Sequence, residues 1–203
     1  MKNYIRVDSR IKCKTGDLDV CAPVIRVNKA FDDDMVDAFS NSFNRALDRN
    51  PSIIPIVIDS YGGEVYCLLE MISLIKSSPV PVATICNGKA MSCGAILASF
   101  GAEGLRFMDP DATVMIHDVS SRAFGKVEEL KADASEADRL NKKVFTMMAR
   151  NCGKPDDFFL KKIHDKGHAD WFLGADESIE VGLVNFKRVP EMTIKVTVDI
   201  DVA

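Results

Sequence analysis

The chain has 203 residues, of which 47% are hydrophobic and 28% are charged. This length suits one domain with a sizeable buried core, so we expect residues 1–203 to form a single domain. The composition excludes a globally disordered chain. The formal net charge is −4, and an acidic surface argues against a protein that wraps DNA or RNA, whose phosphates require a basic stripe.

Three sequence features predict a cytoplasmic protein with no membrane anchor and no bound metal. The longest uncharged stretches, 77–88 and 90–102, are shorter than the roughly 20 apolar residues that a membrane-spanning helix needs. The first fourteen residues carry scattered charges and no apolar segment, unlike a secretory signal peptide. The six cysteines form no CxxC pair and no cluster with histidine. This favours a reducing compartment and argues against a zinc site.

In the first part of the chain, apolar strand patterns alternate with helical patterns. The segments that predict buried strands are 21–27, 53–58, 80–86 and 114–116. Helices are predicted over 32–50, 65–77 and 92–100, with a turn at 87–91. Asp32–Asp34 supply the N-cap and the first-turn acids of the first helix. Strands that alternate with helices predict an α/β fold with a mostly parallel sheet and flanking helices.

A long amphipathic helix dominates the second part of the chain. Its pattern covers 125–150 and places charged residues between the apolar ones, so we expect it to project from the domain. Shorter helices are predicted over 155–163 and 176–181. Residues 193–202 alternate strictly between apolar and polar side chains, which predicts a strand with one apolar face. Residues 190–203 are therefore expected to add a C-terminal strand to the same domain.

Residues able to do chemistry follow three of the predicted strands: Gly62-Gly63, Ser92 and His117. In a parallel sheet, ligands and catalytic groups gather beyond the carboxyl ends of the strands. Ser92 lies where a strand turns into an apolar helix, so the first helical N–H groups favour a developing oxyanion beside it. The alternative is that Ser92 is only a helix N-cap. No phosphate-binding glycine pattern is present.

His117 is one of three histidines and directly follows the predicted strand 114–116. Its imidazole, placed near Ser92, would take the hydroxyl proton and return it to a leaving amine, provided that a third group fixes its tautomer. The residues alone leave that third group open among four aspartates, namely Asp118, Asp165, Asp170 and Asp176. The Gly62-Gly63 turn would direct an N–H at a substrate carbonyl, or would simply be a turn.

Four segments in fixed order carry motifs of one known family, the proteolytic subunit of the Clp protease, ClpP. Residues 59–63 (DSYGG) resemble its N-S-P-G-G, and 86–94 (CNGKAMSCG) resemble its G-x-A-A-S-M-G nucleophile segment. Residues 114–117 (VMIH) match its histidine strand, and 170–184 are similar to its D-R-F-L-S-A-x-E-A-x-E-Y-G-L-V. The likeness covers about 24–189 and implies the ClpP/crotonase-like fold.

The resemblance also implies roles for individual residues. By position, Ser92 is the nucleophile, His117 the general base and Asp170 its orienting acid. The backbone N–H groups of Gly63 and Cys93 are the oxyanion donors. The implied activity is a serine endopeptidase that cleaves polypeptides through an acyl-enzyme and needs no cofactor.

The family further implies a homo-oligomer and a partner. Stacked heptameric rings enclose a chamber, and an AAA+ unfoldase, which uses ATP, feeds unfolded chains into it. The helix at 125–150 would be the handle between rings, and 120–124 a strand along the bound peptide. The chain departs from the family at Tyr61, which replaces a proline, in a longer stretch at 153–170, and in residues 1–22. Such divergence suits a specialised or phage-encoded relative.

Three alternatives use the same residues differently. A catalytically silent ring subunit would share the fold and the oligomer without hydrolysing peptides. A crotonase-type acyl-CoA enzyme would rely on an acid such as Glu64 beside the glycines. A Ser–Lys dyad would use Lys89, three residues before Ser92, as the base in place of His117.

Overall fold

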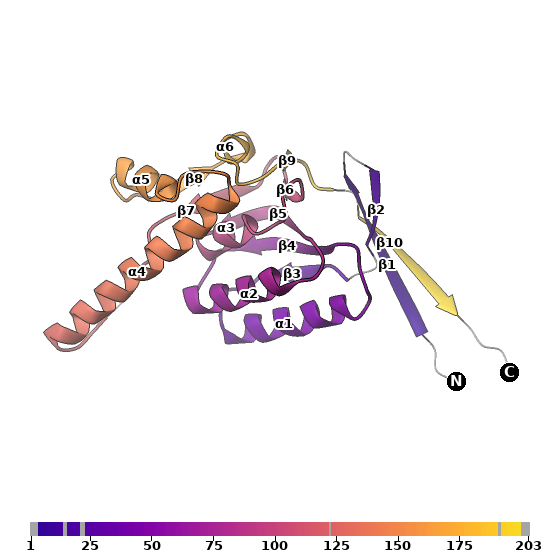
Figure 1. The fold of residues 1–203 in the computed structure, drawn as a ribbon, viewed down its shortest axis with the longest axis horizontal. Coiled ribbons are helices and arrows are strands. Elements are labelled where there is room, and N and C mark those ends of the chain that lie inside the picture. Colours follow the sequence, from indigo (N-terminus) through magenta and orange to yellow (C-terminus); the bar gives the residue numbers. More distant parts are fainter. Residues whose placement is uncertain (1–3, 14–15, 21–22, 122, 191, 200–203) are drawn as a thin grey trace.

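The computed structural model describes residues 4–13, 16–20, 23–121, 123–190 and 192–199. They form a seven-stranded sheet with helices packed around it and a separate three-stranded sheet (Figure 1). The larger sheet is mixed but mostly parallel, which confirms the predicted α/β class. No helix in these ranges is long and apolar enough to cross a membrane.

The larger sheet is built on the long strand β5, which changes partners halfway along. Its strands are β3 (Ile25–Val27), β4 (Ile54–Ser60), β5 (Val82–Met91), β6 (Arg106–Met108), β7 (Thr113–Ile116), β8 (Trp171–Leu173) and β9 (Phe186–Lys187). β5 pairs in parallel with β6 along its first half and with β7 along its second half. β8 is the exception, because it runs antiparallel to β7.

The predicted turn at 87–91 is wrong, because pairing with β7 keeps this backbone extended to Met91. The short strands β6, β8 and β9 were not predicted from the sequence. A strand at 120–124 is also not observed: Ser120, Ser121, Ala123 and Phe124 belong to no strand in the described part of that segment.

The helices pack around the sheet in the predicted order. They are α1 (Asp33–Leu47), α2 (Val65–Ser77), α3 (Cys93–Ala98), α4 (Val127–Asn151), α5 (Phe158–Asp165) and α6 (Ala175–Glu180). Figure 1 shows α1 and α2 side by side on one side of the sheet. The Asp32 side chain accepts a hydrogen bond from the Met35 N–H at 2.8 Å, so it is the N-cap of α1.

The long helix α4 is anchored at one end only. Its C-terminal half buries an apolar stripe against the domain, formed by Leu140, Val144, Phe145, Met148 and Ala149. Its N-terminal half extends away from the body of the molecule (Figure 1). Val127, the first residue of α4, is 65% exposed, and Phe124, just before the helix, is 95% exposed. Within one chain, the apolar side chains that predicted the helix are therefore buried only in its C-terminal half.

The smaller sheet is antiparallel and joins the two ends of the chain. It consists of β1 (Tyr4–Cys13), β2 (Gly16–Val20) and β10 (Met192–Asp199), with β1 in the middle. The alternation at 193–202 predicted β10, and residues 200–202 lie outside the described part. Figure 1 shows this sheet at the end of the molecule opposite the projecting end of α4.

Candidate active site

Ser92 occupies a strained turn between β5 and α3. Its φ of 54° and ψ of −119° lie in a region that non-glycine residues rarely adopt, and such strain persists only where surrounding bonds hold it. The Ser92 N–H donates to the Met115 carbonyl of β7 at 2.8 Å, while the Ser92 carbonyl accepts from Ala95 and Ile96 in α3. Strand and helix thus hold the turn from both sides.

The Ser92 hydroxyl faces a histidine and does not cap its helix. Its Oγ lies 2.9 Å from Nε2 of His117, which directly follows β7. Ser92 is at the N-cap position of α3, but its side chain makes no capping hydrogen bond there. An imidazole at this distance is within reach of the hydroxyl proton, as nucleophilic catalysis requires.

The glycine turn packs directly on the serine turn. A Cβ on Gly62 would lie 2.8 Å from the Ser92 Cβ and 3.0 Å from the Cys93 nitrogen, and Gly62 has a φ of 95°. Only glycine fits there, on both counts. The Cys93 thiol donates to the Gly63 carbonyl at 3.2 Å, so these two residues are neighbours. Neither the Gly63 nor the Cys93 N–H donates to a backbone carbonyl in the described residues.

Two residues that the sequence did not single out hold this glycine turn. The buried Ser60 hydroxyl donates to the Lys29 carbonyl at 2.5 Å and accepts from the Gly62 N–H at 3.1 Å. The Phe31 N–H donates to the Gly62 carbonyl, and the Phe31 carbonyl accepts from Glu64. A polar side chain at the end of a buried strand was the available signal for Ser60.

Asp170 lies opposite His117 but is not bonded to it. The antiparallel ladder pairs Ile116 with Trp171, so His117 and Asp170 are the next residues along the two strands. Facing residues in such a ladder have Cβ atoms roughly 5 Å apart. Asp170 is exposed, and no hydrogen bond joins its carboxylate to the imidazole in the described part of the chain.

In the described residues, the other three candidate aspartates make no hydrogen bond to the His117 imidazole. Asp118 accepts from Asn141 of α4 at 2.7 Å and contacts the His168 Nδ1 at 2.6 Å. Asp176 pairs with Lys187 at 2.8 Å. Asp165 is exposed at the end of α5. The β7–β8 register therefore favours Asp170 among the four.

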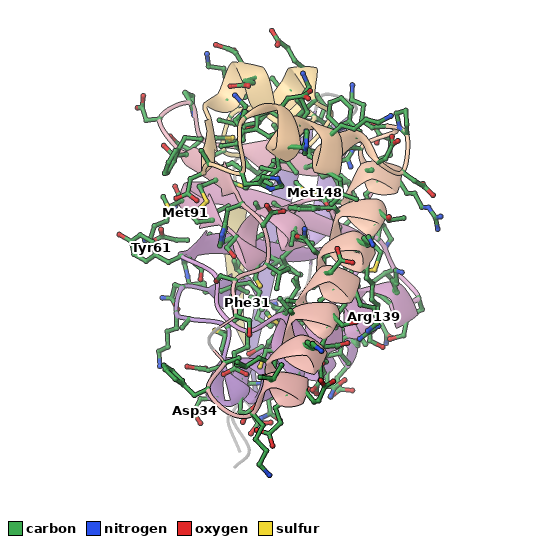
Figure 2. All side chains as sticks on the ribbon, turned by 90° about the vertical axis from the view of Figure 1, so that its left-hand side faces the viewer. Phe31, Asp34, Tyr61, Met91, Arg139 and Met148 are labelled. Atoms are coloured by element: carbon green, nitrogen blue, oxygen red, sulfur yellow. The ribbon has the colours of Figure 1, made fainter. Side chains whose placement is uncertain are left out.

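A groove of about 400 Å³ opens beside the glycine turn. It runs from Gly63 between the start of α2, residues 119–121 and α4. On its α4 wall, Glu136 accepts hydrogen bonds from Tyr66 and Arg139. The Arg139 guanidinium, helped by the Tyr66 hydroxyl, lowers the pKa of Glu136 to about 2. Figure 2 shows Arg139 along α4.

The Cys93 thiol is less suited than the Ser92 hydroxyl to act as a nucleophile, and the Lys89 amine is poorly suited to act as a base. Burial raises the pKa of the Cys93 thiol to about 11, and a neutral thiol is a poor nucleophile. Lys89 Nζ donates to the Asp59 carboxylate at 2.7 Å. This hydrogen bond raises the pKa of the Lys89 amine, so the amine stays charged. A Ser–Lys dyad needs a neutral amine, and this arrangement disfavours it.

In the described residues, no three His, Cys, Asp or Glu side chains converge in a way that would hold a metal ion.

A comparison with models of known protein families shows which family this chain belongs to. The family model of the Clp protease matches residues 22–187. The match includes the serine turn, the glycine turn, His117 and Asp170, and it leaves out β1, β2 and β10. Because it covers well over half of the sequence, this chain belongs to the Clp protease family, a family of peptidases.

Proposed function

We propose that this protein is a serine endopeptidase that hydrolyses unfolded polypeptides or peptides through an acyl-enzyme. The observation that carries the proposal is the 2.9 Å contact between Ser92 Oγ and His117 Nε2. It occurs on a strained turn beside the glycine turn, and the N–H groups of Gly63 and Cys93 donate to no backbone carbonyl in the described residues. Geometry of this kind is typical of acyl transfer.

In the proposed reaction, His117 accepts the Ser92 proton as Oγ attacks the carbonyl carbon of the scissile peptide bond. The carbonyl oxygen becomes an oxyanion and accepts hydrogen bonds from the N–H groups of Gly63 and Cys93. His117 then gives the proton to the leaving amine, and the C–N bond breaks to leave an ester on Ser92. Water, deprotonated by His117, attacks this ester, and the proton returns to Ser92 as the acid product leaves.

Asp170 completes the proposed triad. A carboxylate that accepts the Nδ1–H of His117 would fix the tautomer in which Nε2 is free to act as base, and would stabilise the imidazolium. The ladder register supports this role, because it sets Asp170 across from His117.

The proposal includes an oligomer of stacked heptameric rings in the cytoplasm, without a cofactor of its own. The projecting half of α4 and the segment before it support the oligomer, since the exposed apolar side chains of Phe124 and Val127 are suited to contact between copies. Within this proposal, an AAA+ unfoldase is the partner that delivers substrate. A mass far above 22.4 kDa in analytical ultracentrifugation is expected, and a monomer at micromolar concentration would contradict the rings.

The direct test is hydrolysis of fluorogenic peptides and of an unfolded polypeptide by wild type and by Ser92→Ala. We expect the variant to lose about 10³-fold or more of kcat. Ser77→Ala is the matched control, because Ser77 is exposed and its hydroxyl bonds only the Leu74 carbonyl of its own helix. Retained activity in Ser92→Ala would overturn the nucleophile assignment. An assembled wild type without hydrolysis would instead indicate a silent ring subunit, and turnover of an acyl-CoA thioester a crotonase-type enzyme.

A further inference from the structure

Lys89 contacts both residues that flank Ser60 at the start of the glycine turn. Its Nζ lies 2.7 Å from the Asp59 carboxylate and 4.6 Å from the centre of the Tyr61 ring. The first contact is an ion pair, and the second is a cation–π contact. One side chain on β5 therefore holds the end of β4 from two directions.

The local backbone is built to allow this clamp. The β4–β5 ladder is irregular between Ile58 and Ser60, so Asp59 lies outside the regular pairing. A Cβ on Gly88 would come within 3.0 Å of the Asp59 carboxylate, and Gly88 has a φ of 99°. Glycine at this position leaves room for the carboxylate beside Lys89.

Ser60 and Phe31 hold Gly62 by hydrogen bonds, but the Tyr61 N–H that precedes it donates to no backbone carbonyl in the described residues. Tyr61 is 73% exposed, and Figure 2 shows it extending from the rim of the molecule near Met91. It is followed by Gly62 and Gly63, the two residues with the widest backbone freedom. The aligned motif has proline where this chain has Tyr61, and proline would fix φ covalently. Here the Lys89 contacts stand in the place of that restraint.

We propose that Lys89 is a positioning residue that sets the Gly63 N–H for the oxyanion; this inference rests on the proposed function. Lys89 does not contact Ser92 or His117 in the described structure, and it acts through Asp59 and Tyr61. An N–H that is misplaced by a loosened turn weakens the transition state more than the bound substrate. Loss of Lys89 therefore lowers kcat and leaves KM nearly unchanged.

The first test is steady-state peptide hydrolysis by Lys89→Met, which keeps the length of the side chain and removes its charge. We expect a fall in kcat of roughly tenfold, because exposed ion pairs and cation–π contacts are each weak, and less than the 10²–10³-fold loss that follows removal of an oxyanion donor. If the wild type is active and Lys89→Met has the same kcat, the proposal is overturned.

The second test is rescue by proline. Ser60 is extended within β4, as a residue before proline must be, and the Tyr61 N–H donates to no backbone carbonyl in the described residues. Adding Tyr61→Pro to Lys89→Met restores the lost backbone restraint, so kcat rises by about fivefold or more over the single variant. A Lys89 that acted on substrate by its charge would not be rescued by proline, and that result would contradict a positioning role.

A readout that needs no activity separates this inference from the proposed function. Hydrogen exchange of the amides at 60–63 is expected to be faster in Lys89→Met than in wild type. If the wild type is inactive and Lys89→Met still shows faster exchange, the proposed peptidase activity is contradicted and the restraint by Lys89 is supported. If the wild type is active and Lys89→Met exchanges at the same rate, the restraint by Lys89 is contradicted. If Lys89→Met does not fold by circular dichroism, Asp59→Asn removes the same ion pair and takes its place.

Discussion

The two sides of the candidate site are constructed differently. The serine side consists of Ser92, His117 and the glycine turn, which lie at the ends of β4, β5 and β7 and are joined by short contacts. The acid side is the exposed connection from α5 to β8, which carries Asp170. In the proposed mechanism, the nucleophile, the base and the oxyanion donors therefore all belong to the side that is held by strand ends and short contacts, whereas the proposed acid is aligned by strand register alone.

The difference follows from what holds each side in place. Parallel strands buried on both faces cannot shift without disrupting the core. The acid side instead depends on surface polar contacts, above all the one between His168 and Asp118 at 2.6 Å. Gly167 and His168 both have positive φ values, 66° and 61°. Segments held by exposed contacts open at lower free-energy cost than core strands, so the acid side is where activity would be adjusted.

The largest predicted effect comes from breaking the serine side. His117→Ala should lower kcat by about 10³-fold or more, and the Ser92→Ala/His117→Ala double variant should be no worse than either single variant, because the two groups act as one unit. Steady-state kinetics with one peptide substrate measures this. Additive losses in the double variant would contradict the pairing.

The next effect separates the acid from its neighbour. Asp170→Asn should lower kcat by about 10²–10⁴-fold, because an asparagine leaves His117 in the wrong tautomer. Asp118→Asn is the matched control, since Asp118 bonds Asn141 and His168 and should cost far less. The same kinetic assay decides between them. A larger loss in Asp118→Asn would transfer the role of the acid to Asp118.

A smaller effect is expected from loosening the acid side without touching the acid. His168→Ala removes the contact to Asp118 in a residue whose side chain is 61% exposed. The Tm of the variant should fall by no more than about 2–4 °C, because the lost contact is a surface pair. Its kcat should fall by several fold, because Asp170 is held less well. Calorimetry and kinetics on the same sample check both. A kcat equal to that of wild type would show that the loop needs no anchor.

The smallest effect concerns two buried thiols next to the serine side, Cys86 in β5 and Cys93 in α3. Burial raises the pKa of Cys93 to about 11 and that of Cys86 to about 12. A raised folded-state pKa means that the unfolded chain loses these protons first, so stability is full below about pH 9 and falls as the pH rises toward 11. Thermal melting at pH 7.5 and pH 10 measures the decline, and Cys86→Ala should reduce it. A decline of the same size in that variant would exclude the Cys86 thiol as a cause.

The sequence was most informative where a strand is long and its end carries unusual residues. Gly62-Gly63, Ser92 and His117 were identifiable because they follow the predicted apolar strands 53–58, 80–86 and 114–116, respectively. The sequence could not choose among the aspartates without the family resemblance. That choice depends on β8, a strand of three residues whose pattern is too short to predict and whose register sets Asp170 across from His117.

The supports of the site were also hidden from the sequence, for a different reason. Ser60, Phe31 and Lys89 act through contacts between segments about 30 residues apart, which periodicity does not report. The turn expected at 87–91 failed because pairing with β7 overrides the local preference of Asn87 and Gly88. Tertiary pairing of this kind is decided by the whole sheet.

The most direct test of the account is covalent labelling of the wild-type protein with a fluorophosphonate, followed by intact mass and peptide mapping. The probe reacts with a serine that a neighbouring base has activated and requires no knowledge of the substrate. We predict one adduct per chain, located on Ser92 and lost in Ser92→Ala. A wild-type chain that gains no adduct, or gains it at another residue, would contradict the claim that Ser92 and His117 form the catalytic pair.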